Sequence, residues 1–202
     1  MGWISESGRR AAFAAAAVVA LLPAVARAQP GVAWYAPLVP EVSGATGSGF
    51  VSIQFNSTTS ELRIRTNWAG LSGTTTVAHV HCCVAVPGAG TVGVAVTPGT
   101  LPGFPTGRTV GSYDATIDLT NTASFTNAFR NANGGTVPSA RAALIAGLNS
   151  GTAYLNIHSS TFAPGEIRGF LQVVPEPGTY ALVATGVAGL GLLARRRRGL
   201  TA

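Results

Sequence analysis

The stretch FVSIQFNSTTSELRIRT, residues 50–66, alternates apolar and polar side chains on both sides of a polar break. Val51 and Ile53 lie two residues apart in its first half, as Leu62 and Ile64 do in its second half. Successive side chains of a β-strand point to opposite faces, so the alternation predicts two strands, each with one buried and one solvated face. The intervening NSTTS consists of turn-forming residues. The stretch therefore predicts an antiparallel hairpin.

Short strand candidates of the same kind continue along the chain, separated by clusters of glycine, proline, asparagine and serine. They are TVAHVHCCV, TVGVAV, ATIDL, AYLNIH and EIRGFLQV. Regularly spaced short strands with such breaks are typical of antiparallel β-sandwiches. The sequence thus predicts a mainly β domain, an antiparallel β-sandwich with Greek-key connections.

One segment has the spacing of a helix instead. In PSARAALIAGLNSG, the apolar residues Leu144, Ile145 and Leu148 recur at helical intervals, with Ser139 as a candidate N-cap and Gly151 as the stop. The segment NTASFTNAFRNA is a candidate for one or two further helical turns. We therefore expect one or two short helices packed against the sandwich.

Most of the positive charge lies at the two ends of the chain, although the net charge of the whole sequence is +6. Residues 29–174 contain six arginines and five acids, which leaves a net charge of +1. A nucleic-acid-binding surface needs clustered basic residues to neutralise phosphates. The middle of the chain lacks this excess, so we expect no nucleic-acid partner.

The first 28 residues have the three parts of an export signal. A pair of arginines precedes the apolar run AAFAAAAVVALL, and the run is followed by PAVARA, in which Ala26 and Ala28 form the small-residue cleavage pattern. A run of twelve apolar residues is too short to span a bilayer, which needs roughly twenty. The sequence therefore predicts that residues 1–28 are a signal peptide, cleaved between Ala28 and Gln29.

Residues 175–202 carry a second signal. Pro175, Glu176 and Pro177 are followed by an uncharged stretch at 178–194, which predicts a short transmembrane helix. A block of arginines ends the chain and is expected to hold the tail in the cytoplasm. The block consists of Arg195, Arg196, Arg197 and Arg198.

This order of elements closely resembles the PEP-CTERM sorting signal of Gram-negative bacteria. The resemblance implies that an exosortase acts on the chain while it is anchored in the inner membrane. It also implies that the helix is removed near Pro-Glu-Pro and that the protein reaches the cell surface or the secreted polysaccharide matrix. The alternative is a membrane anchor that is never cleaved.

Between the two signals, residues 29–174 are expected to form one domain.

The three histidines occur in two strand candidates. Strand alternation places His79, His81 and Cys83 on one face of the first candidate. It places Asn156 and His158 on one face of the second. If the two strands are neighbours, three imidazoles converge. Imidazole is both a common metal ligand and a good hydrogen-bonding group, so the sequence leaves open a zinc or copper site and a hydrogen-bonded structural cluster.

Cys82 and Cys83 are adjacent in a chain predicted to be exported, where thiols tend to be oxidised. They could form a disulfide with each other or bridges to other chains, or Cys83 could serve as a fourth metal ligand beside the imidazoles. The compartment favours the disulfide between neighbours. Such a ring disturbs strand alternation, so it predicts that the strand ends at His81.

Three motifs resemble those of the CHRD domain, which was first named in chordin. They are AHVH at residues 78–81, YLNIH at residues 154–158 and GEIRG at residues 165–169, within a resemblance that covers residues 42–173. The chain departs from the pattern directly after AHVH, where many members have Gly-Pro in place of the two cysteines. The resemblance implies a β-rich extracellular module.

The CHRD motifs also contain Asn156, Glu166 and Arg168, which are expected to be structural residues. Glu166 and Arg168 lie two residues apart, on one face of a strand. This placement favours an ion pair or a cross-strand contact over an acid/base role.

The two-histidine motif is also similar to the copper-binding strand of Cu/Zn superoxide dismutases, which are themselves β-sandwiches. A dismutase copper site uses four histidines, whereas this chain has three. The chain also lacks a G-x-S-x-G elbow and a glycine-rich phosphate loop, so an enzyme is not favoured. We predict a structural, adhesive or binding role, with an extracellular polysaccharide or a surface protein as partner. The alternative is a zinc- or copper-binding extracellular protein, redox-active if its architecture is dismutase-like.

Overall fold

In the computed structural model of the protein, the predicted hairpin is formed by β2 (Ser48–Asn56) and β3 (Glu61–Ala69). The strands pair antiparallel with Ile53 opposite Ile64, and both side chains are fully buried. The side chain of Asn56 closes the turn by accepting a hydrogen bond from the backbone N–H of Thr58 at 2.9 Å. The alternation in residues 50–66 therefore predicted both the pairing and the buried face correctly.

The structure describes residues 32–174 and 183–190. The predicted signal peptide, Gln29, Pro-Glu-Pro and the arginine block lie outside the described residues, as does part of the predicted transmembrane helix. Within the two described ranges, no helix is long and apolar enough to cross a membrane.

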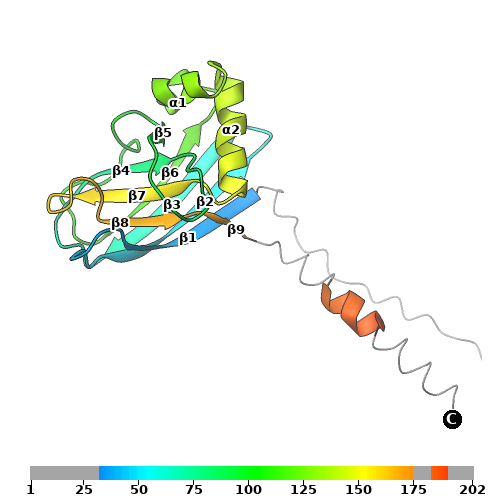
Figure 1. The fold of residues 1–202 in the computed structure, drawn as a ribbon, viewed down its shortest axis with the longest axis horizontal. Helices are drawn as coiled ribbons and strands as arrows, with labels where there is room; N and C mark the ends of the chain where they lie inside the picture. The colour runs from blue at the N-terminus through cyan, green and yellow to red at the C-terminus, as the bar shows by residue number, and fades with distance from the viewer. Residues whose placement is uncertain (1–31, 175–182, 191–202) are drawn as a thin grey trace, which may run out of the picture.

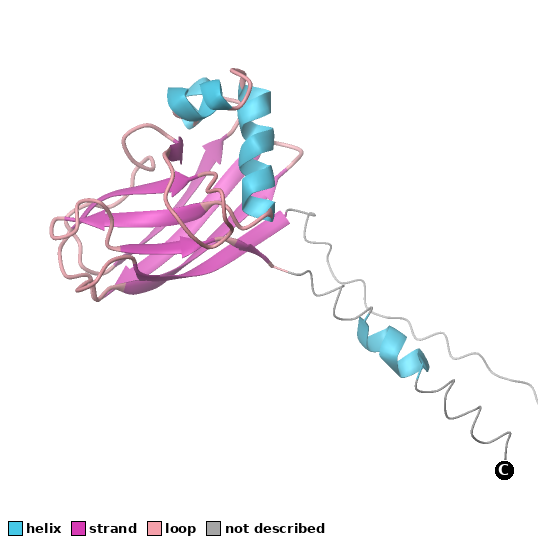
Figure 2. Cartoon of the chain, in the orientation of Figure 1, coloured by secondary structure: helices cyan, strands magenta, loops and turns pink. Residues whose placement is uncertain are grey.

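Nine strands form one antiparallel sheet, in the order β5-β4-β7-β8-β1-β2-β3-β6, with β9 also paired to β1. Figures 1 and 2 show that this sheet curls rather than lying flat. The prediction of a mainly β, antiparallel fold with a few short helices is confirmed. The remaining strands are β1 (Val32–Pro40), β4 (Thr75–His81), β5 (Val94–Val96), β6 (Gly111–Asp118), β7 (Tyr154–Ser159), β8 (Ile167–Phe170) and β9 (Gln172–Val173).

The curl arises because β1 is shared between the two halves of the sheet. Near its start Trp34 pairs with Val173 of β9, and at its end Val39 pairs with Arg168 of β8. The apolar faces of the two halves meet in one core. That core includes Trp34, Leu38, Ile53, Leu62 and Ile64 from one half and Ala78, Val80, Leu155, Ile157 and Ile167 from the other.

Two helices, α1 (Asn127–Ala132) and α2 (Val137–Asn149), follow a short 3₁₀ turn, η1 (Thr122–Ser124). Figure 1 shows α2 crossing one end of the sheet, with α1 and β5 beside it. The N-cap of α2 is Thr136 rather than the predicted Ser139, because Ser139 is the third helical residue and completes a capping box with Thr136. Gly151 follows the helix with φ of +71°, a conformation that glycine adopts readily.

Candidate metal centre

The histidines lie on the polar face of two neighbouring strands. In the register of β4 and β7, His79 is opposite Asn156 and His81 is opposite Tyr154. The alternate residues of both strands are apolar and point into the core. Because the aliphatic face of both strands is buried in the core, the imidazoles on the other face must point away from the core. His158 follows on the same face of β7.

The structure brings the three imidazoles together. One ring nitrogen from each of His79, His81 and His158 can be chosen so that all three lie within 4.8 Å of one another. The shortest contact joins His79 Nδ1 to His158 Nε2 at 3.1 Å. Two nitrogens bound to one tetrahedral zinc ion at 2.0 to 2.1 Å lie about 3.3 to 3.4 Å apart. The His79–His158 pair is therefore close to the required spacing, and His81 would reach it by moving about 1 to 1.5 Å.

Each imidazole is held through its other nitrogen by a backbone carbonyl. His79 Nε2 lies 2.8 Å from the oxygen of Gly99, and His81 Nδ1 lies 2.7 Å from that of Val92. His158 Nδ1 lies 2.7 Å from the oxygen of Ala163. A carbonyl oxygen can only accept, so each of these nitrogens carries the hydrogen. Metal-bound histidines are usually oriented by the same kind of contact.

This assignment leaves His79 Nδ1, His81 Nε2 and His158 Nε2 as the nitrogens with free lone pairs in the neutral rings. Burial lowers the pKa of His79, and it lowers the pKa of His81 to about 4, so both rings are neutral near pH 7. Two lone pairs facing each other at 3.1 Å repel. The contact between His79 and His158 therefore requires a shared proton or a cation between the two nitrogens.

His81 gives a second indication of a missing partner. Its Nε2 is buried and has no hydrogen-bond partner in the part of the chain that the structure describes. The ring stacks on Tyr154, with centroids 4.6 Å apart, and it stands nearly perpendicular to the ring of His79. A buried polar atom without a partner is uncommon in folded proteins. The arrangement is that of a ligand directed at a shared point.

The predicted structural residues form a network beside the histidines. Asn156 donates a hydrogen bond to Glu41, and Arg168 forms an ion pair with Glu41 at 3.1 Å. Burial raises the pKa of Glu41, although the positive charge of Arg168 and the hydrogen bond from Asn156 oppose this. The side chain of Glu166 does not join this network and instead accepts a hydrogen bond from the backbone of Ser72, while its backbone carbonyl accepts one from the N–H of Glu41 at 2.9 Å. Sequence reasoning missed Glu41, which lies 127 residues from Arg168 and carries no motif.

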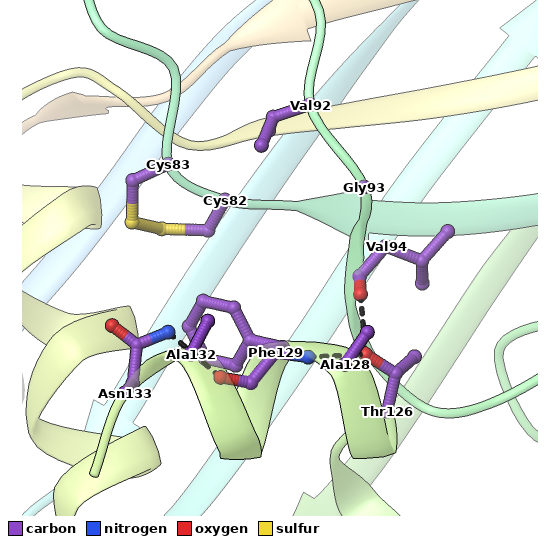
Figure 3. A pocket seen from close by; sticks show the side chains of 10 residues that line it. All are labelled: Cys82, Cys83, Val92, Gly93, Val94, Thr126, Ala128, Phe129, Ala132 and Asn133. Atoms are coloured by element: carbon purple, nitrogen blue, oxygen red, sulfur yellow. Dashed lines mark hydrogen bonds between the residues drawn. A yellow bond between two sulfur atoms is a disulfide. The ribbon is translucent and has the colours of Figure 1, made fainter.

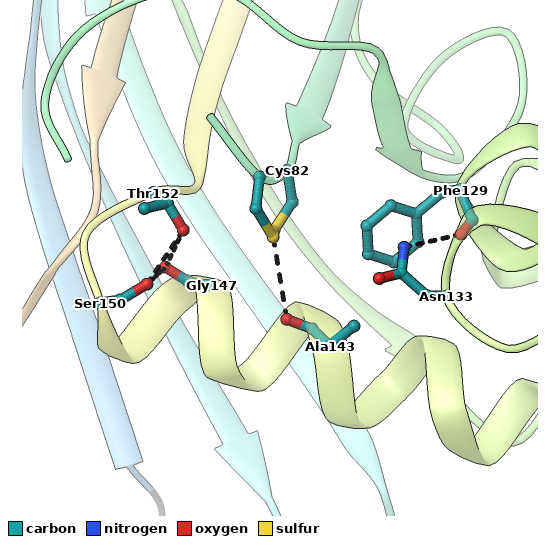
Figure 4. Close-up of a disulfide and its surroundings, with 8 residues drawn as sticks. Cys82, Phe129, Asn133, Ala143, Gly147, Ser150 and Thr152 are labelled. Atoms are coloured by element: carbon teal, nitrogen blue, oxygen red, sulfur yellow. Dashed lines mark hydrogen bonds between the residues drawn. A yellow bond between two sulfur atoms is a disulfide. The ribbon is translucent and has the colours of Figure 1, made fainter. Parts of the chain in front are cut away.

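Cys82 and Cys83 form a disulfide directly after the end of β4 at His81 (Figure 3). The ring lies on α2 beside Gly147 (Figure 4). Cys83 Sγ is 3.8 Å from the carbonyl oxygen of Ala143 in the same helix. The structure therefore does not bring Cys83 to the imidazoles as a fourth ligand.

A cleft of about 530 Å³ opens beside the disulfide, between β5 and α1. Figure 3 shows the two cysteines facing Phe129 across it. Its polar side chains already have partners, since Thr126 donates to the carbonyl of Val94 and Asn133 donates to that of Phe129. The cleft is therefore mainly apolar, and none of the three histidines lines it, although Val92 lines the cleft and its carbonyl also contacts His81.

Comparison with family models gives two matches. The CHRD domain matches residues 35–171, which include both histidine segments, and the PEP-CTERM protein-sorting motif matches residues 173–198. No curated protein and no solved structure matches the chain. The sorting motif implies processing by an exosortase and export to the cell surface or beyond. Because the first match covers more than half of the chain, the protein belongs to the CHRD domain family.

Proposed function

We propose that this CHRD-domain protein acts as a structural or binding module at the cell surface or in the extracellular polysaccharide matrix, and that its domain holds a zinc or copper ion. The signal peptide is removed between Ala28 and Gln29. The chain is then anchored in the inner membrane until an exosortase removes the tail that contains Arg195 to Arg198.

The observation that supports metal binding is the direction of the free lone pairs. His79, His81 and His158 each give one N–H to a backbone carbonyl and turn the remaining nitrogen toward the other two rings. Three neutral nitrogens suit zinc and copper, whereas magnesium and calcium prefer oxygen ligands. An ion at this point would join β4 to β7.

A structural role for the ion is the simplest use of this geometry. The carbonyls that orient His79 and His81 belong to the segments on either side of β5. Metal binding would therefore stabilise the chain around β5 as well as the two strands. If the strands follow the dismutase arrangement, a copper ion here could also be redox-active. Consumption of superoxide by the copper-loaded protein would test that second candidate.

Calorimetric titration of the mature protein with zinc, after removal of bound metal by a chelator, tests the proposal. We expect one equivalent to bind, and we expect this binding to be lost in the His79→Ala/His158→Ala variant. The Cys82→Ala/Cys83→Ala variant is the matched control, since it keeps all three imidazoles and should bind as the unaltered protein does. Equal binding by the double-histidine variant would refute the site. If neither zinc nor copper binds, the histidines form a hydrogen-bonded structural cluster.

Processing is tested separately by the intact mass of the protein recovered from cells. The mature chain should begin near Gln29 and lack the arginine block. A surface-localised species that still contains Arg195 to Arg198 would contradict cleavage by an exosortase and indicate a permanent anchor.

A further inference from the structure

The outer face of the half-sheet β1–β2–β3–β6 carries two large exposed aromatic side chains. The inward residues of these strands form the core, so their neighbours in sequence point to solvent. Among the outward residues, Tyr35 is 48% exposed and Phe50 is 59% exposed. The register places Phe50 opposite Pro37, two residues along β1 from Tyr35, and an exposed apolar patch can mark a binding surface.

The strand register places these rings beside polar side chains. Tyr35 is opposite Ser52, Ser52 is opposite Arg65, and Arg65 is opposite Asp114, so the four form one row across the sheet. The adjacent row continues from Phe50 to Asn67 and Ser112. All seven residues line one shallow groove of about 520 Å³. This volume lies within the usual range of small-molecule sites, about 300 to 1,000 Å³.

Several polar groups in the groove are free to bind a ligand. The side chains of Ser52, Asn67 and Ser112 form no hydrogen bond with any residue that the structure describes. Arg65 uses Nε to contact Asp114 at 3.2 Å, which fixes the guanidinium while both terminal nitrogens keep their hydrogens for a ligand. A guanidinium of this kind can bind a carboxylate through two parallel hydrogen bonds.

The positive charge of Arg65 is only partly compensated by Asp114. Asp114 also forms a two-point ion pair with Arg63, at 2.8 and 2.7 Å, so one carboxylate is shared by two guanidinium groups. Arg65 therefore shares its carboxylate partner and keeps part of its positive charge for a ligand beside the rings, whereas the acids Glu61 and Asp118 lie opposite each other two rows farther along β3 and β6. A ligand that fits this groove therefore needs flat apolar faces for Tyr35 and Phe50, hydroxyl groups for the serines and Asn67, and a carboxylate for Arg65.

We propose that this groove binds an acidic polysaccharide through its uronate units. Sugar rings stack on Tyr35 and Phe50, whose aromatic rings offer apolar surface with little loss of side-chain freedom. A uronate carboxylate binds the terminal nitrogens of Arg65, and hydroxyl groups bind Ser52, Asn67 and Ser112. The proposal rests on the proposed location in the matrix, but it uses no residue of the histidine cluster.

The proposal is tested with alginate, a polyuronate. The mature, metal-loaded protein is run by electrophoresis through gels that contain alginate and through gels without it. Pullulan serves as the uncharged polysaccharide. Excess metal is removed beforehand so that free ions do not bridge protein and polymer. Alginate should retard the unaltered protein, and the retardation should weaken as the salt concentration rises.

Two variants distinguish stacking from charge. Tyr35→Ala/Phe50→Ala should weaken alginate binding by about tenfold or more, because it removes both stacking surfaces. Arg65→Gln should weaken it by a similar factor, because it removes the bidentate carboxylate contact. Val86→Ala/Val110→Ala is the matched control, since these side chains are 61% and 63% exposed and lie outside the groove. The control should bind alginate as the unaltered protein does.

The proposal is overturned if alginate does not retard the unaltered protein, or if both groove variants bind it as well as the control does. The proposal is also overturned if pullulan retards the protein as much as alginate does and Arg65→Gln has no effect, because the ligand would then not be acidic. All five substituted positions are exposed, so unfolding midpoints equal to that of the unaltered protein should verify the fold. Zinc content and surface localisation are measured on the same variants. If these are normal while alginate binding is absent, the groove proposal fails and the proposed function stands.

Discussion

Replacing Gly147 by alanine tests how the Cys82–Cys83 disulfide packs on α2. In an exposed helix interior, the change from glycine to alanine stabilises a protein by about 1 kcal/mol, because alanine loses less backbone entropy on folding. Gly147 is buried, however, and Figure 4 shows it on the helix directly beside the disulfide. A Cβ atom at this position would lie closer than 3.0 Å to the sulfur atoms of both cysteines.

The magnitude follows from these two opposing effects. Overpacking a well-filled core costs about 1 to 3 kcal/mol, and the upper part of this range applies because two sulfur atoms of a covalent ring must move together. The higher helix propensity of alanine offsets about 1 kcal/mol of this loss in the free energy of unfolding. We therefore expect Gly147→Ala to lower the free energy of unfolding by about 1 to 2 kcal/mol.

Chemical denaturation of the mature protein, followed by the fluorescence of the buried Trp34 and Trp68, measures this change. The control places the same substitution in a Cys82→Ala/Cys83→Ala background. With the sulfur atoms gone, Gly147→Ala should stabilise by about 1 kcal/mol, so the coupling between the two sites should be about 2 to 3 kcal/mol. If Gly147→Ala stabilises both proteins equally, the disulfide does not pack on α2 as described.

Two further predictions concern the histidines and the neighbouring ion pair. Burial lowers the pKa of His81 from 6.5 to about 4, so the unfolded chain binds more protons between these values. The free energy of unfolding of the metal-free protein should therefore fall as the pH is lowered through that window, which a series of denaturant titrations would measure; a flat profile would contradict the burial of neutral imidazole. Glu41→Ala leaves Arg168 and Asn156 without their shared acceptor, and it should lower the free energy of unfolding by about 1 to 3 kcal/mol. In an Arg168→Met background, Glu41→Ala should lower the free energy of unfolding by less. An equal loss in both backgrounds would show that the ion pair with Arg168 contributes nothing to this effect.

The sequence predicted the strands in which apolar and polar residues visibly alternate, but it missed β1, because apolar residues such as Tyr35 and Val39 also occupy the exposed face of that strand. The hairpin at residues 50–66 and the direction of the histidine side chains both follow from a buried apolar face, which alternation makes visible. The N-cap of α2 was misplaced, although Pro138 gave a signal, because proline favours the first helical turn and so indicates a start before Ser139.

Other features could not be read from the sequence because they depend on tertiary contacts. The carbonyls of Val92, Gly99 and Ala163 orient the imidazoles, but every residue has a carbonyl and none of these is marked by its side chain. The partnership of Glu41 with Arg168 depends on the register of β1 and β8, which are far apart in the chain. The sharing of β1 between both halves of the sheet likewise appears only once all pairings are known.

X-ray absorption at the zinc edge of the mature protein, loaded with one equivalent of zinc, tests the proposed metal centre most directly. Binding by His79, His81 and His158 predicts three imidazole nitrogens at about 2.0 to 2.1 Å, with a light atom such as a water oxygen in the remaining position. The spectrum should be unchanged in the Cys82→Ala/Cys83→Ala variant and lost with the bound zinc in His79→Ala/His158→Ala. A sulfur neighbour at about 2.3 Å, or a spectrum that survives loss of the two histidines, would contradict the account.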